Sequence, residues 1–135
     1  MSQWVEPKTN WAKSDYFMLD PDYIRIKGNI IYLYEMASNL YGAFSILPMG
    51  EYTIADIPHA DFFNTIEENV QKLADNHYLP NGFESRKYFY GNGKPWTHDD
   101  LNRIERNLLL LYQAFSSQDA GKRELPYDLG REVRI

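Results

Sequence analysis

The sequence predicts a mainly α-helical domain made of three copies of one helix motif, with a small β-hairpin allowed in the connections. The first observation is an internal repeat, since Asp22–Ser38 aligned on Asp100–Ser116 gives identical residues at seven positions. A weaker third copy, Phe62–Leu73, lies between them and keeps the shared Ile and Asn. The second observation is a common apolar spacing in all three copies, which is that of one face of an α-helix.

This apolar face predicts the core of the domain. With the shared Ile as position 0, apolar residues recur at positions −3, 0, +4 and +7 of each copy. The first and third copies extend the face to position +11 with Ala37 and Phe115. The predicted core residues are Tyr23, Ile26, Ile30 and Leu33, then Phe63, Ile66, Val70 and Leu73, then Leu101, Ile104, Leu108 and Leu111.

The repeat predicts helices over residues 21–40, 59–75 and 98–117. The first has a start signal in Asp20-Pro21, because Asp is a favoured N-cap and Pro fits the first helical position. Thr97 with Asp100 resembles a capping box for the third. Gly28 lies inside the first helix and is expected to permit a close crossing with another helix. Residues 1–117 therefore form the predicted three-helix domain, and residues 118–135 a predicted extended tail.

The two connections are long and carry many aromatic residues. The apolar runs on either side of Met49-Gly50 allow a small hairpin, and residues 86–96 could form a strand that ends in a Gly-Asn-Gly turn. Both connections exceed what a minimal helix bundle needs.

Composition narrows the classes of function. The chain has 135 residues, a net charge of −5 and no cysteine. One domain of this size has no positive field to attract nucleic acid, and it has no disulfide or thiolate metal site. The absence of a signal peptide and of a long apolar run predicts synthesis in the cytoplasm and no membrane span.

Catalytic interpretations are weaker than structural ones. His59, His77 and His98 lack the spacing of known metal sites, and we expect them to have capping and surface roles. The carboxylate pairs Glu67-Glu68 and Asp99-Asp100 are expected to complement helix dipoles, because adjacent helical residues point in different directions. No phosphate-binding glycine loop is present. We therefore predict no enzymatic activity, no metal and no cofactor.

Two polar positions recur on the predicted helices. Asn29, Asn69 and Asn107 share position +3, where an Asn could bond the backbone of a packed segment and fix its register. A polar residue that simply flanks the core is the alternative. Arg25 and Arg103 share position −1 and could pair with a Glu of a neighbouring helix or with a loop carbonyl.

The third copy resembles a segment of tail, baseplate and fibre proteins of bacteriophages that infect Gram-positive bacteria. Their pattern is Trp, a few residues, Asp, then Phe or Leu followed by Asn-Arg-Ile-Glu-x-Asn. The matching residues here are Trp96, Asp100, Leu101, Asn102, Arg103, Ile104, Glu105 and Asn107. The first copy matches through Trp11, Asp15, Tyr16, Phe17, Arg25, Ile26 and Asn29 and departs at Ile24 and Lys27. The resemblance implies a structural role in the virion and no catalytic residues.

We therefore expect a structural or adaptor subunit of a phage or prophage tail or baseplate that forms a homo-oligomer and binds other virion proteins. An alternative is a module that binds cell-wall carbohydrate through aromatic loops, and a hydrolase ranks third. We expect about half of the loop aromatics to pack in the core and the others to carry contacts. The candidate interaction residues are Trp4, Trp11, Tyr16, Phe17, Tyr52, Tyr88, Phe89, Tyr90 and Trp96.

Overall fold

The computed structural model describes residues 3–50, 60–75, 80–90 and 96–124, with side chains up to residue 118. A π-helical turn, η1 (Leu19–Tyr23), leads into α1 (Ile24–Tyr41), and α2 (Ala60–Asp75) and α3 (His98–Glu124) follow. The predicted mainly α, three-helix class is confirmed. Within the described ranges no helix is both long enough and apolar enough to cross a membrane.

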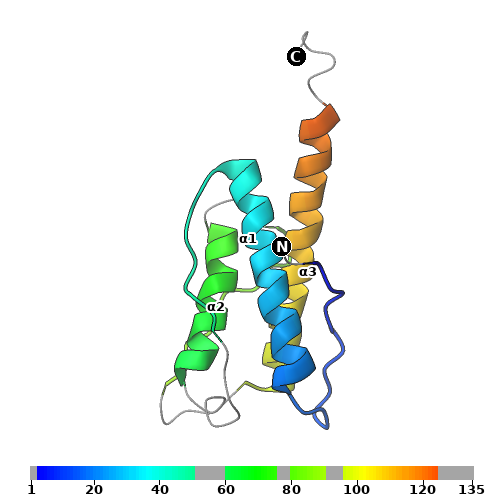
Figure 1. The fold of residues 1–135 in the computed structure, drawn as a ribbon. Helices are drawn as coiled ribbons and strands as arrows, with labels where there is room; N and C mark the ends of the chain where they lie inside the picture. Colours follow the sequence, from blue (N-terminus) through cyan, green and yellow to red (C-terminus); the bar gives the residue numbers. More distant parts are fainter. Residues whose placement is uncertain (1–2, 51–59, 76–79, 91–95, 125–135) are drawn as a thin grey trace.

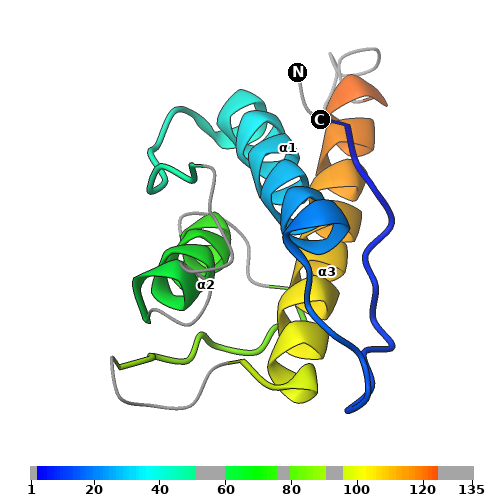
Figure 2. The same ribbon diagram turned by 60° about the horizontal axis from the view of Figure 1, so that its bottom comes forward.

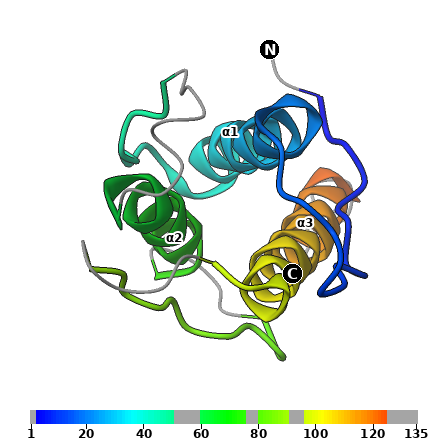
Figure 3. The ribbon, with the colours of Figure 1, turned by 90° about the horizontal axis from the view of Figure 1, so that it is seen from below.

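The three helices run parallel and surround one axis (Figures 1 and 3). Their first turns meet in a cluster of rings, in which Phe62 of α2 lies 5.4 Å from Tyr23 and 5.6 Å from Trp96 between ring centroids. All twelve predicted core positions are buried, as are Ala37 and Phe115. The repeated apolar face of the sequence is thus the shared core of the bundle.

The helix starts match the sequence signals in part. Thr97 and Asp100 form the predicted capping box, because the Thr97 amide donates to the Asp100 carboxylate at 2.9 Å and the Asp100 amide donates to the Thr97 hydroxyl at 3.2 Å. At the first helix Asp20 has extended backbone angles (φ −125°, ψ 113°). The carboxylate that accepts a backbone hydrogen bond there belongs to Asp22, from the Met18 amide at 2.9 Å.

Two other predictions about the helices were wrong. A Cβ added at Gly28 would meet nothing within 4 Å, so this glycine does not lie at a close helix crossing. Helix α3 continues to Glu124, so the predicted extended tail from residue 118 begins as helix (Figure 1). Apolar periodicity stops after Phe115, so it marks where burial ends and not where the helix ends.

Three non-helical segments lie along the outside of the bundle, one before the first helix and two in the connections between helices. We call them strap 1 (residues 3–11), strap 2 (residues 43–50) and strap 3 (residues 83–90). Figure 2 shows strap 1 alongside α1 and α3. None of the described residues forms a strand, so the hairpin and strand predictions fail where they can be checked, up to Gly50 and over residues 86–90. Their remaining parts, residues 51–54 and 91–95, lie outside the described residues.

Candidate functional site

The repeated Asn at position +3 binds one strap residue in each copy. The side-chain amide accepts from the backbone N–H and donates to the backbone C=O of the same residue, as a neighbouring strand would. The backbone contacts expected of these residues are observed, and their role in fixing register stays a prediction. The pairs are Asn29 with Val5 (2.9 and 2.8 Å), Asn69 with Leu47 (2.7 and 2.9 Å) and Asn107 with Glu84 (3.0 and 2.8 Å).

A second Asn, at position −2, binds a residue near the C-terminal end of two straps in the same way. Asn102 of α3 binds both backbone groups of Trp11 at 2.7 and 3.0 Å. Asn64 of α2 binds both backbone groups of Phe89 at 2.9 and 2.8 Å. Strap 1 therefore joins α1 to α3, and strap 3 joins α3 to α2. In α1 this position is Ile24, which is 58% exposed.

The Glu at position +1 of α3 forms the centre of the α1–α3 clamp, which we define as Glu105 with Arg25, Trp11 and the Lys8 amide. Arg25 donates to both Glu105 oxygens, from Nε at 2.9 Å and from Nη2 at 2.5 Å. The Trp11 indole donates at 2.7 Å and the Lys8 backbone amide at 3.0 Å. Four donors thus satisfy a carboxylate that is fully buried.

The same chemistry recurs at Glu67, the centre of the α3–α2 clamp with Arg103, Trp96 and the Lys87 amide. Arg103 donates from Nη1 at 2.7 Å and from Nη2 at 2.5 Å. The Trp96 indole donates at 3.1 Å and the Lys87 amide at 3.3 Å. Of the two partners expected for the repeated Arg, a Glu of a neighbouring helix or a loop carbonyl, the structure shows the Glu for both Arg25 and Arg103.

Burial and pairing act in opposite directions on these arginines. Burial disfavours the charged guanidinium, but the Glu105 and Asp22 carboxylates beside Arg25 outweigh it and raise its pKa. The pKa of Arg103 is raised in the same way by Glu67 and Asp100. Both arginines therefore keep their full charge over the pH range in which proteins are studied.

The third junction, between α2 and α1, lacks this clamp. Lys27 occupies the position of the clamp carboxylate in α1, and Thr65 occupies the position of the clamp arginine in α2. Lys27 Nζ lies 3.4 Å from the Gly50 carbonyl of strap 2, which also accepts from the Tyr23 hydroxyl at 2.7 Å. The charge at this position is therefore reversed, and the strap contributes a carbonyl where straps 1 and 3 contribute an amide.

The predicted interaction aromatics divide into two groups. Five pack in or against the core within the chain, in line with the expectation for about half of them: Trp4, Trp11, Phe17, Phe89 and Trp96. Trp4, for example, stacks on Tyr112 with ring centroids 4.1 Å apart. Three are exposed, namely Tyr16 (83%), Tyr88 (66%) and Tyr90 (74%). Tyr52 lies outside the described residues.

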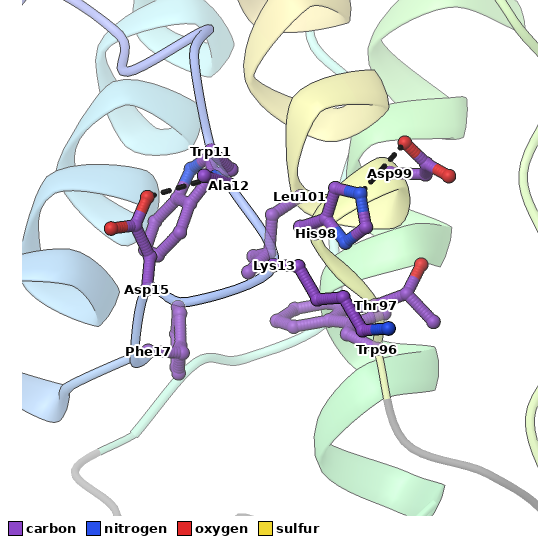
Figure 4. Close-up of a pocket in the computed structure, with 10 residues that line it drawn as sticks. All are labelled: Trp11, Ala12, Lys13, Asp15, Phe17, Trp96, Thr97, His98, Asp99 and Leu101. Atoms are coloured by element: carbon purple, nitrogen blue, oxygen red, sulfur yellow. Dashed lines mark hydrogen bonds and ion pairs between the residues drawn. The ribbon is translucent and has the colours of Figure 1, made fainter.

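A pocket of about 410 Å³ lies between residues 11–17 and the start of α3 (Figure 4). Trp11 and Phe17 face it from the N-terminal segment, and Trp96 and Leu101 face it from the other side. Its polar lining residues are Lys13, Asp15, Thr97, His98 and Asp99.

The other residues considered for chemistry lie apart from one another or in structural contacts. Glu67 is buried in its clamp, while Glu68 pairs with Arg86 at the surface. His98 Nε2 lies 3.4 Å from Asp99, and His59 and His77 are outside the described residues. Over the described part of the chain, no three His, Cys, Asp or Glu side chains are grouped so that they could hold a metal ion.

Sequence reasoning singled out the Asn at +3 and the Arg at −1 but missed the other half of the network. Glu67 and Glu105 share position +1, and Asn64 and Asn102 share position −2, so the repeat itself contained the signal. Trp11 and Trp96 both match the Trp of the phage pattern, but they lie at different distances from the shared Ile, and nothing in the repeat showed that each would reach the Glu of a neighbouring helix.

Comparisons with protein-family models, with curated proteins and with solved structures find no match to this chain.

Proposed function

We propose that the protein is a structural or adaptor subunit of a phage or prophage tail or baseplate, made in the host cytoplasm and incorporated into the virion through protein–protein contacts. The observation that carries the proposal is the internal use of the repeated motif. Its Asn, Arg and Glu side chains hold straps and neighbouring helices together. The Asn-Arg-Ile-Glu-x-Asn pattern of phage tail proteins contains the same residue types. This agreement supports a structural role for the pattern.

Strap 3 offers the most suitable surface for binding a partner protein. Tyr88 and Tyr90 are exposed on it, and tyrosine is enriched at protein interfaces because it buries a large area with few rotatable bonds. The strap backbone is held by Asn107 at one end and by Asn64 at the other. A surface that is already ordered loses little conformational entropy when a partner binds.

Purified particles and purified proteins provide the test. The chain should be detected by mass spectrometry in phage or tail particles from the strain that encodes it. Immobilised chain should also capture at least one tail or baseplate protein of the same phage. The double variant Tyr88→Ser/Tyr90→Ser should weaken capture about tenfold or more, as expected for central interface aromatics.

Gln113→Ala, on an exposed position of α3, is the matched control and should leave capture unchanged. Light scattering of the free chain should show a homo-oligomer. Absence from purified particles, together with a strict monomer that captures no tail protein, would exclude the proposal.

A further inference from the structure

The pocket beside the start of α3 shares Trp11 and Trp96 with the two clamps, and its other lining residues lie outside the clamps. Figure 4 shows Phe17 and Trp96 on opposite sides of its lower part, with Asp15 and Asp99 at opposite edges. The rings of Phe17 and Trp96 meet edge to face with centroids 5.7 Å apart. Both are only partly buried, which leaves apolar ring surface at the pocket.

The two carboxylates on the rim of the pocket can each accept further hydrogen bonds. Asp99 is an exposed carboxylate, with one oxygen 3.4 Å from His98 Nε2. Asp15 uses one oxygen to accept from the Ala12 amide at 2.8 Å and to pair with Lys8 at 3.3 Å. The Ala12 and Lys8 contacts lower the pKa of Asp15, so this carboxylate is ionised at neutral pH.

Charge and shape narrow the class of ligand. Lys8 pairs with Asp15, and Lys13 and Asp99 also have opposite charges, so the site has little net charge and does not favour an ionic ligand such as phosphate. A purely apolar ligand would cover polar groups of the rim without replacing their hydrogen bonds to water, which is costly. A ring with apolar faces and hydroxyl groups around its edge meets both requirements. The volume of about 410 Å³ is within the range of small-molecule sites.

We propose that this pocket binds a neutral saccharide unit, with a face of the sugar ring against Phe17, its edge toward Trp96, and its hydroxyl groups donating to Asp15 and Asp99. His98 supplies a further hydrogen-bonding group beside Asp99. This activity goes beyond the proposed structural role, and it belongs to the chain itself whether or not the chain is part of a tail.

NMR titration of the full-length chain tests the site, with glucose, galactose and N-acetylglucosamine as separate probes. At least one sugar should produce saturable shifts in the Trp96 indole and His98 signals, with a Kd of about 1 mM or lower. Asp99→Asn and Phe17→Leu should each raise that Kd about fivefold or more, since they remove a charged acceptor and an aromatic face. Both variants should retain the dispersed spectrum of the folded chain.

Tyr88→Ser is the matched control, because Tyr88 is an exposed ring that does not line the pocket. It should leave the Kd unchanged. The proposal is overturned if none of the three sugars gives a saturable shift up to about twentyfold above 1 mM. It is also overturned if a shift occurs but is insensitive to Asp99→Asn and Phe17→Leu, or is lost in Tyr88→Ser.

Discussion

A side-chain amide can take the place of a β-strand, and the repeated asparagines do so. Asn has a donor and an acceptor in one plane at the spacing of a backbone N–H and C=O, so one side chain satisfies both groups of a strap residue. Asp would lose the donor, and an aliphatic residue would leave both backbone groups without a partner. This explains why Asn29, Asn69 and Asn107 share one position although the strap residues they bind have different side chains.

Replacing one of these asparagines should loosen its strap. Asn107→Ala removes two hydrogen bonds to Glu84 and should lower the free energy of unfolding by about 2 to 3 kcal/mol. Urea denaturation measures the change. Asn39→Ala, at an exposed position of α1, is the control and should change stability by less than about 0.5 kcal/mol. Equal effects of the two substitutions would contradict the strap role.

Asp100 links the capping box, strap 3 and the α3–α2 clamp. Burial opposes its ionisation, but the Lys87 ammonium at 2.8 Å, the Thr97 amide and the nearby Arg103 outweigh burial and lower its pKa. A carboxyl whose pKa is lower in the folded state stabilises the fold above its unfolded pKa of about 3.9, and this contribution is lost as the pH falls through the folded value.

Stability should therefore decrease below about pH 4, and Asp100→Asn should make that decrease smaller. Urea denaturation at neutral pH and at acid pH, for both proteins, measures the difference. Asp99→Asn is the matched control, because its side chain is 83% exposed. If Asp100→Asn and the parent lost equal stability on acidification, the cause assigned to Asp100 would be wrong.

At the scale of the element, the straps account for the parallel helices. Helices joined by short loops pack antiparallel, whereas a parallel neighbour requires the chain to return along the full length of the bundle. Straps 2 and 3 lie in the two connections that make this return, whereas strap 1 precedes α1; all three form backbone hydrogen bonds with Asn side chains of the helices. Connections that exceed the needs of a minimal bundle are therefore necessary parts of this fold.

Helix α1 contains a glycine, Gly28, at an interior position where packing does not require one. Gly28 costs helix stability relative to Ala, and an added Cβ meets no atom within 4 Å. Gly28→Ala should raise the free energy of unfolding by about 0.5 to 1 kcal/mol. Thermal and urea denaturation should agree on the direction, and a loss of stability would show that Gly28 has a role in packing.

For the whole molecule, the three units follow a cyclic order. Arg25 of α1 reaches Glu105 of α3, and Arg103 of α3 reaches Glu67 of α2. The pair that would close the ring, from α2 to α1, would be Thr65 and Lys27. Two of the three junctions are thus closed by a buried ion pair, and the third depends on the core, on Asn69 and on contacts to Gly50.

Installing the missing pair tests this cyclic equivalence. Lys27→Glu alone should be destabilising, because it places a carboxylate beside the Gly50 carbonyl without a cation. Thr65→Arg in the same chain should recover much of the loss, with a favourable coupling energy of about 1 to 2 kcal/mol in a double-mutant cycle.

A cycle on Arg106 and Glu84, an exposed pair 3.4 Å apart, is the control and should give about 0.5 kcal/mol or less. Coupling between positions 27 and 65 no larger than that of the exposed pair would argue against a pseudo-threefold arrangement.

The sequence by itself determined the three helices, the core, and the Asn residues at position +3 that bind the straps. Helical periodicity requires only that one face be buried, so the repeat alone assigns Ile26, Ile66 and Ile104 to the core. The repetition of Asn at one phase likewise indicated a register role, because a chance polar residue would not recur there.

Only the tertiary structure decided which segments those residues hold and which aromatics remain outside. Trp11 reaches Glu105 across most of the chain, and Tyr88 and Phe89 are neighbours on a strap that turns one outward and the other inward. Neither fact is encoded by local spacing, because the path of an irregular segment is set by the side chains of distant helices that bind its backbone.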